Sequence, residues 1–172
     1  MSKHGPAPST VGAPTGTTRA IAEALATWFG CGRSSFAPGT VGSLGALLPL
    51  LPLLSTQPVW WRLLLIVLVA VFLIPGIWSA TAYEKITGRA DPQPVVIDEV
   101  LGQWITLAFA TKLSWMSFGL AFLLFRAFDI VKPFPVRQAE SLPTGTGIVM
   151  DDVVAGLYAG LVLYAAGCFN FY

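Results

Sequence analysis

Charged side chains are scarce in this sequence: Asp, Glu, Lys and Arg make up 11% of its 172 residues, whereas hydrophobic residues make up 55%. The mean hydropathy of +0.70 lies outside the usual range of soluble domains and indicates a membrane protein. A formal net charge of +1 gives no reason to expect a nucleic acid partner. The length suits one compact helical domain.

Cysteine and histidine are also few. Cys31 and Cys168 lie near opposite ends of the chain, so they offer neither metal-ligand spacing nor a framework of disulfides. The first 20 residues lack the apolar core of a secretory signal peptide and are rich in Pro, Gly, Ser and Thr. We therefore expect a disordered tail over residues 1–18 and a single membrane-embedded helical domain over 19–172.

Apolar segments dominate the rest of the chain. Helical spacing of Ile21, Leu25, Trp28 and Phe29 predicts an amphipathic N-terminal helix that lies on the membrane or packs on the domain. The strongest spanning candidate is 59–82, whereas 44–54 is short and interrupted by proline. Segments 100–110 and 113–128 indicate a helical hairpin that either crosses the membrane or only dips into it, and both arrangements return the chain to the same side. Segment 153–169 is the last apolar segment. The sequence predicts an all-α membrane bundle with about four to five apolar helical segments.

Basic residues give this bundle an orientation, because cytoplasmic loops retain Lys and Arg. With the N-terminus inside and one crossing per segment, only Arg62 and Lys112 of the ten basic residues fall outside. The eight that fall inside are Lys3, Arg19, Arg33, Lys85, Arg89, Arg126, Lys132 and Arg137.

The same topology brings five of the nine acidic residues to the cytoplasmic ends of the segments: Asp98, Glu99, Asp129, Asp151 and Asp152. Taken singly, these acids are equally well explained as helix caps, or for Asp129 as an ion-pair partner of Arg126 or Lys132. Together they would repel one another. Carboxylate oxygens bind hard cations such as Mg²⁺, which in turn hold phosphate oxygens, so the set predicts a metal-dependent phosphoryl site.

The polar segment 30–43, "GCGRSSFAPGTVGS", reaches the same face of the membrane. Its glycines, hydroxyls and the Arg33 guanidinium suit phosphate binding, although a glycine-rich turn between two helices explains the segment equally well. No Gly-Lys-Ser/Thr follows, so it is not a P-loop. Arg126 and Lys132 could neutralise phosphate charge, and positive-inside anchoring is the alternative for both and for Arg137.

Other phosphatase chemistries lack their residues. The only histidine is His4 in the tail, and the sixth position after Cys31 is Ala37 where a cysteine phosphatase has arginine. The two aspartates, one residue apart, of a haloacid-dehalogenase-type nucleophile are missing as well. Metal-activated water with a carboxylate as general base remains. Two other classes stay open: a small ion-binding or transport protein with a cytoplasmic acidic cluster, and a structural subunit.

Four motifs carry a resemblance to a known family: "FAPGTVGSL", "VIDEVLGQWITL", "FRAFDIVKPFPV" and "GIVMDDVVAGL". In order and approximate spacing they resemble the phosphatidylglycerophosphatase A family over roughly residues 25–165. The resemblance implies a Mg²⁺-dependent enzyme of the bacterial inner membrane and of phospholipid biosynthesis, which converts phosphatidylglycerophosphate into phosphatidylglycerol and phosphate at the cytoplasmic rim. Soluble relatives of the family resemble compact helical domains built around a central helix.

The resemblance also assigns residues. It places the acidic motifs on the five acids above and the glycine-rich motif on Pro38, Gly39, Thr40, Gly42 and Ser43. We expect all five acids as metal ligands and four of them, Asp98, Glu99, Asp129 and Asp152, as catalytic residues. We expect phosphate to be bound by Arg33, Gly39, Thr40, Ser43, Arg126 and Lys132. The stretch "CGRSS" departs from the family pattern, which makes the role of Arg33 the least supported.

Overall fold

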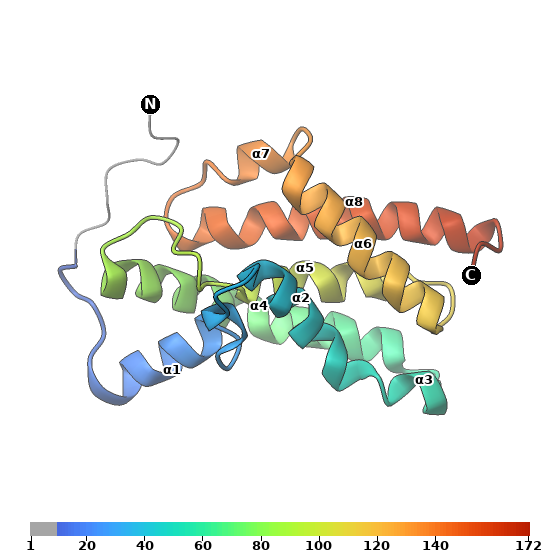
Figure 1. Cartoon of the computed structure of the whole chain (residues 1–172), viewed down its shortest axis with the longest axis horizontal. Helices are drawn as coiled ribbons and strands as arrows, with labels where there is room; N and C mark the ends of the chain where they lie inside the picture. Colours follow the sequence, from blue (N-terminus) through green and yellow to red (C-terminus); the bar gives the residue numbers. More distant parts are fainter. Residues whose placement is uncertain (1–9) are drawn as a thin grey trace.

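The structure is a computed structural model that describes residues 10–172, all of whose regular elements are helices (Figure 1). The elements run in the order α1 (Gly16–Ala26), η1 (Cys31–Arg33), α2 (Pro38–Leu47), η2 (Leu48–Leu50), α3 (Leu53–Thr56), α4 (Trp61–Thr87), α5 (Ile97–Ala108), α6 (Trp115–Val131), α7 (Val136–Ala139) and α8 (Gly145–Cys168). Residues 1–9 of the expected tail lie outside the described range. Helix α1 begins inside the range expected as tail.

Helix α5 forms the core of the bundle. Nine of its 12 residues are buried, and it packs against α2, α4, α6 and α8. At about 1.5 Å per residue it is about 18 Å long, well short of a hydrocarbon layer of about 30 Å. The apolar segment 100–110 is therefore a buried core helix, and it is not confirmed as a crossing of the predicted bundle.

Two helices, α4 and α8, are long and apolar enough to cross a membrane by length and composition. Within the most apolar window of α4 only 22% is buried, so most of that helix presents apolar side chains outward. Four to five crossing segments are thus not confirmed in the described part of the chain. The apolar segment 44–54 is broken into the end of α2, η2 and α3.

Glycines let α5 and α8 approach closely. A Cβ on Gly102 would lie 2.7 Å from the carbonyl oxygen of Asp152, and one on Gly156 would lie 2.6 Å from the carbonyl oxygen of Gly102. Such small residues allow two helix backbones to touch. The contact holds the first turns of α8 beside the first turn of α5.

The opposite end of α5 is closed by an arginine from α4. The Arg62 guanidinium donates hydrogen bonds to the carbonyl oxygens of Ala108, at 3.1 Å, and Ala110, at 2.7 Å. These carbonyls lie at the end of α5, where backbone acceptors lack partners within the helix. Arg62 thus helps to fix the axis of α5, whose other end carries the acidic residues.

Helix α1 packs on α4, which is one of the two placements expected for this segment. Ala22 and Ala26 are buried, whereas Ile21 and Phe29 are exposed. Of the other two predicted apolar residues, Trp28 is also buried and Leu25 is half-buried, so the expected apolar face is buried only in part.

Candidate active site

A cavity of about 720 Å³ opens where the start of α2, the start of α5, the end of α6 and the first turns of α8 meet. Eight acidic and two basic residues line it, so eight of the nine acids of the chain lie around one space. Among them are the five predicted from the sequence. The other three are Glu84, Asp91 and Glu140, which the sequence reasoning missed.

The sequence analysis did not include Glu84 because it predicted a helix only over the apolar segment 59–82, whereas α4 continues beyond that segment. The helix runs to Thr87 and buries Glu84, whose Oε1 accepts a hydrogen bond from the backbone N–H of Asp91 at 3.2 Å. Gly76, Ala80 and Glu84 lie four residues apart and share one buried face of the helix. That spacing was the signal available in the sequence.

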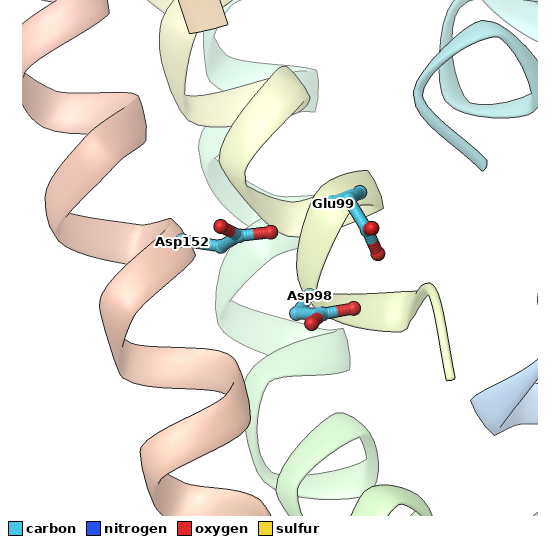
Figure 2. Close-up of side chains that lie close together, drawn as sticks. All are labelled: Asp98, Glu99 and Asp152. Atoms are coloured by element: carbon cyan, nitrogen blue, oxygen red, sulfur yellow. The ribbon is translucent and has the colours of Figure 1, made fainter. Parts of the chain in front are cut away.

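Three carboxylates form the tightest cluster in the cavity. Ligand atoms of Asp98, Glu99 and Asp152 all lie within 4.8 Å of one another. Figure 2 shows the Asp152 carboxylate pointing from α8 toward α5, where Asp98 and Glu99 lie in the first turn. Each of the three has a buried oxygen without a hydrogen-bond partner among the described residues.

Such oxygens are what a hard cation requires. Buried polar atoms normally have hydrogen-bond partners, and carboxylates held this close repel one another unless positive charge or protons intervene. Mg²⁺ and similar cations bind through carboxylate oxygens. The residues present therefore fit a divalent cation held by Asp98, Glu99 and Asp152.

Electrostatics at the start of α5 agree with this. Burial, and then the neighbouring Glu99, raise the pKa of Asp98 well above its usual range. Burial also raises the pKa of Glu99, although less, because its hydrogen bond with Asp98 and the nearby Arg126 act in the opposite direction. Without a cation, the pair tends to hold protons at a pH where exposed carboxyl groups are fully ionised.

The helix-cap interpretation of these acids is not supported. No side chain caps α5 or α8, and Asp151 and Asp152 lie in the second turn of α8, well beyond its first residues. Helix α8 begins at Gly145, eight residues before the apolar segment that starts at 153. Asp98 lies inside α5, where the cap position belongs to Val96.

Two other predicted acids lie in ion pairs with the two basic residues of the cavity. Nη1 of Arg126 lies 2.6 Å from Oδ2 of Asp129 and 3.8 Å from Oε1 of Glu99. Nζ of Lys132 lies 2.5 Å from Oδ2 of Asp151. Asp129 and Asp151 therefore neutralise and hold basic groups, whereas within residues 10–172 neither Asp98 nor Asp152 forms an ion pair with a basic residue.

Lys132 reaches the cavity because the chain leaves α6 at that residue. It takes a left-handed φ of 46°, which ends the helix and allows the side chain to turn toward α8. Burial alone would lower the pKa of the ammonium group, but the hydrogen bond to Asp151 and its charge raise it overall. Lys132 is thus firmly cationic.

Four of the eight non-glycine residues with positive φ in the described part of the chain line the cavity. Ala37, Asp91, Lys132 and Thr144 have φ between 44° and 55°, and all four line it. This conformation is costly for residues other than glycine and persists where the surroundings impose it. The surroundings of the cavity therefore hold four backbone positions in an unfavourable conformation.

The predicted glycine-rich segment reaches the cavity only in part. Gly39 lines it, and a Cβ at that position would lie 2.2 Å from Oε1 of Glu99. Ser43 is fully buried, and its hydroxyl donates back to the Gly39 carbonyl oxygen at 2.9 Å. Neither Thr40 nor Ser43 lines the cavity. Arg33 lies in an adjoining hollow of about 460 Å³ and pairs with Glu23 at 3.0 Å.

Known proteins resemble this chain over most of its length. The profile of the family Phosphatidylglycerophosphatase A matches residues 24–167. A protein of Bacteroides thetaiotaomicron, named as a candidate phosphatidylinositol-3-phosphatase, is 42% identical over 148 residues, which is 83% of this chain and 91% of that protein.

Two further relatives carry the family name. The phosphatidylglycerophosphatase A of Haemophilus influenzae is 42% identical over 142 residues, covering 82% of this chain and 85% of that protein. The protein of that name from Escherichia coli is 35% identical over 144 residues, covering 83% and 81%. No solved structure matches the chain.

Proposed function

The chain belongs to the phosphatidylglycerophosphatase A family, and from that premise we propose that it hydrolyses phosphatidylglycerophosphate to phosphatidylglycerol and phosphate with a divalent cation, Mg²⁺. The observation that carries the proposal is the cluster of Asp98, Glu99 and Asp152 in the acidic cavity. A phosphomonoester is a dianion near neutral pH. It could not enter a space lined by eight acids and two bases without added positive charge.

The three clustered carboxylates would hold the cation. When bound, Mg²⁺ supplies positive charge for the phosphoryl oxygens and lowers the pKa of water, so that hydroxide becomes available near neutral pH. Asp98 and Asp152 come from different helices. Their separation is set by the close glycine contact of α5 and α8, which positions the ligands before substrate arrives.

Arg126 and Lys132 would bind the phosphoryl oxygens. Both residues line the cavity, and the Arg126 guanidinium has N–H donors beyond the one that binds Asp129. Asp129 orients Arg126 and Asp151 orients Lys132, which restricts both cations to the cavity. Charge that develops on the phosphoryl group during hydrolysis would be stabilised by donors already in place.

The site would lie at the cytoplasmic rim of a bacterial inner membrane. The cavity is formed at the C-terminal end of α4 and the N-terminal end of α8, the two helices able to cross a membrane. Among the basic residues predicted inside, Arg126 and Lys132 line the cavity and Arg33 and Arg89 line the adjoining hollow, which agrees with the positive-inside rule if this end faces the cytoplasm. The acids are gathered at one end of the bundle, which argues against an ion pathway through it.

Phosphate release from a panel of lipids tests the proposal. Purified protein with Mg²⁺ should release phosphate from phosphatidylglycerophosphate, and more slowly from phosphatidate and phosphatidylinositol 3-phosphate. If phosphate were released faster from phosphatidylinositol 3-phosphate, the preferred substrate would be that lipid, as in the name of the Bacteroides relative. No release from any of them by folded protein would refute the proposal.

A matched pair of variants links the activity to the cavity. Asp98→Asn should lower kcat/KM by about 100-fold, because it removes one of three carboxylates from the proposed cation site. Glu23→Gln removes the one acid that lies outside the cavity, paired with Arg19 and Arg33, and should leave kcat/KM unchanged.

A further inference from the structure

The outer face of α6 carries a row of exposed apolar side chains. Met116, Leu123 and Ile130 are each more than half exposed and follow one another at intervals of seven residues, which places them on one side of the helix. Phe134, four residues further on, is 75% exposed. We call Met116, Leu123, Ile130 and Phe134 the α6 stripe. In Figure 1 α6 crosses α8, against which it packs.

The α6 stripe leads to the mouth of the cavity. Asp129 and Lys132 line the cavity, and between them Ile130 is 71% exposed. The end of α6 therefore presents charge to the inside and apolar surface to the outside.

A second apolar side chain lies at the mouth on the α2 side. Phe36 is 82% exposed and directly precedes Ala37, Pro38 and Gly39, which line the cavity. A Cβ on Gly39 would lie 3.0 Å from Nη1 of Arg126, so this edge of the mouth adjoins α6.

Membrane crossing does not by itself account for the stripe. Helix α6 has 17 residues, about 26 Å, which is shorter than the two candidate spans α4 and α8. Large contiguous apolar surface on the outside of a protein marks a site of interaction. At this place the surface adjoins a cavity whose proposed substrate is an amphiphile, with a phosphate at one end and two acyl chains at the other.

We propose that the acyl chains of the lipid substrate lie along the α6 stripe while the headgroup enters the cavity beside the end of α6. The inference rests on the proposed function and names the surface that holds the apolar part of its substrate. The acidic lining keeps hydrocarbon out of the cavity, and the stripe gives the hydrocarbon a place beside it. Contacts with the stripe would favour lipid over water-soluble phosphomonoesters.

A paired substitution tests this surface. Ile130→Gln with Phe134→Gln makes the end of the stripe polar without touching a charged group of the cavity. The matched control is Val59→Gln with Phe169→Gln, since those residues are 92% and 77% exposed, lie outside α4 and α8, and do not line the cavity. The substrates are dioleoyl phosphatidylglycerophosphate in phosphatidylcholine vesicles and glycerophosphoglycerophosphate, which is the same headgroup without acyl chains.

In the stripe variant, KM for the vesicle substrate should rise by about tenfold or more, because two apolar side chains lose their contact with lipid. Its kcat/KM for the deacylated substrate should stay within about twofold of the wild type, and the control variant should change neither value. An unchanged KM on vesicles would overturn the inference. So would an equal loss on both substrates or an equal loss in the control.

If wild-type protein cleaved neither substrate, the proposed function would be refuted, but the role of the α6 stripe would still be open to test. A second measurement tests that role without using activity. A bimane attached to Phe134→Cys, in protein with Cys31→Ser and Cys168→Ser, should be quenched by phospholipids brominated on the acyl chain. Absence of quenching in vesicles would show that the stripe does not contact acyl chains.

Discussion

Replacing Gly39 by alanine should inactivate the enzyme without unfolding it. A Cβ at this position would lie 2.2 Å from Oε1 of Glu99, whereas ordinary contacts begin at about 3.4 Å, so the carboxylate has to move by about 1 Å. The Nη1 atom of Arg126, 3.0 Å from the same Cβ, has to shift as well. Both obstacles are ends of flexible side chains, so the fold can accommodate the methyl group while the site cannot.

Displacements of about 1 Å at reacting groups can cost about 100-fold in rate, and we expect a loss of that size in kcat/KM for Gly39→Ala. Phosphate release from phosphatidylglycerophosphate measures it, and a thermal melt reports on the fold. Gly119→Ala is the matched control, because it adds the same methyl group to a helix with no atom within 4 Å. It should keep full activity. A normal rate for Gly39→Ala would refute the placement of Glu99 beside α2.

Three further outcomes follow from the site. Asp152→Asn should weaken Mg²⁺ binding, measured by calorimetry, by about 10- to 100-fold. It should also raise the melting temperature of the cation-free protein, because one of the three clustered carboxylates can no longer be charged. Unchanged Mg²⁺ binding would show that Asp152 is not a ligand of the cation. Burial raises the pKa of Asp98 and Glu99, so the native cation-free protein keeps protons that the unfolded chain releases, and its free energy of unfolding should fall as pH rises above their ordinary values of 3.8 and 4.5. Mg²⁺ displaces those protons, so its stabilising effect in thermal melts should grow between about pH 5 and pH 8, and an effect independent of pH would contradict the cluster. In a cysteine-free background, Gln57→Cys should react with an impermeant maleimide from outside the cell and Gln138→Cys should not, whereas the opposite pattern would invert the proposed orientation.

The regular elements of residues 10–172 are all helices, as predicted from the sequence, and the five predicted acids line one cavity. Both predictions rest on the order of the segments along the chain. The sequence did not separate core helices from crossing helices. Apolar residues on α5 serve a buried core, and they form the same pattern that contact with lipid would produce. Only packing against α4 and α8 distinguishes the two, and packing is not a local property of sequence.

The division of labour among the acids also required the structure. Asp151 and Asp152 are neighbours in sequence, yet side chains of consecutive helical residues point about 100° apart. One therefore meets Lys132, and the other faces Asp98 on α5. The sequence could name the carboxylates, but their partners depend on the angle at which α8 crosses α5.

The most direct test of the account is the Mg²⁺ dependence of phosphate release from phosphatidylglycerophosphate by wild-type protein. The account predicts no release in the presence of excess chelator and full recovery when Mg²⁺ is restored, with Asp152→Asn requiring about 10-fold or more Mg²⁺ for its residual rate. Full activity in chelator, from protein freed of bound metal, would contradict the central claim that Asp98, Glu99 and Asp152 hold a catalytic cation.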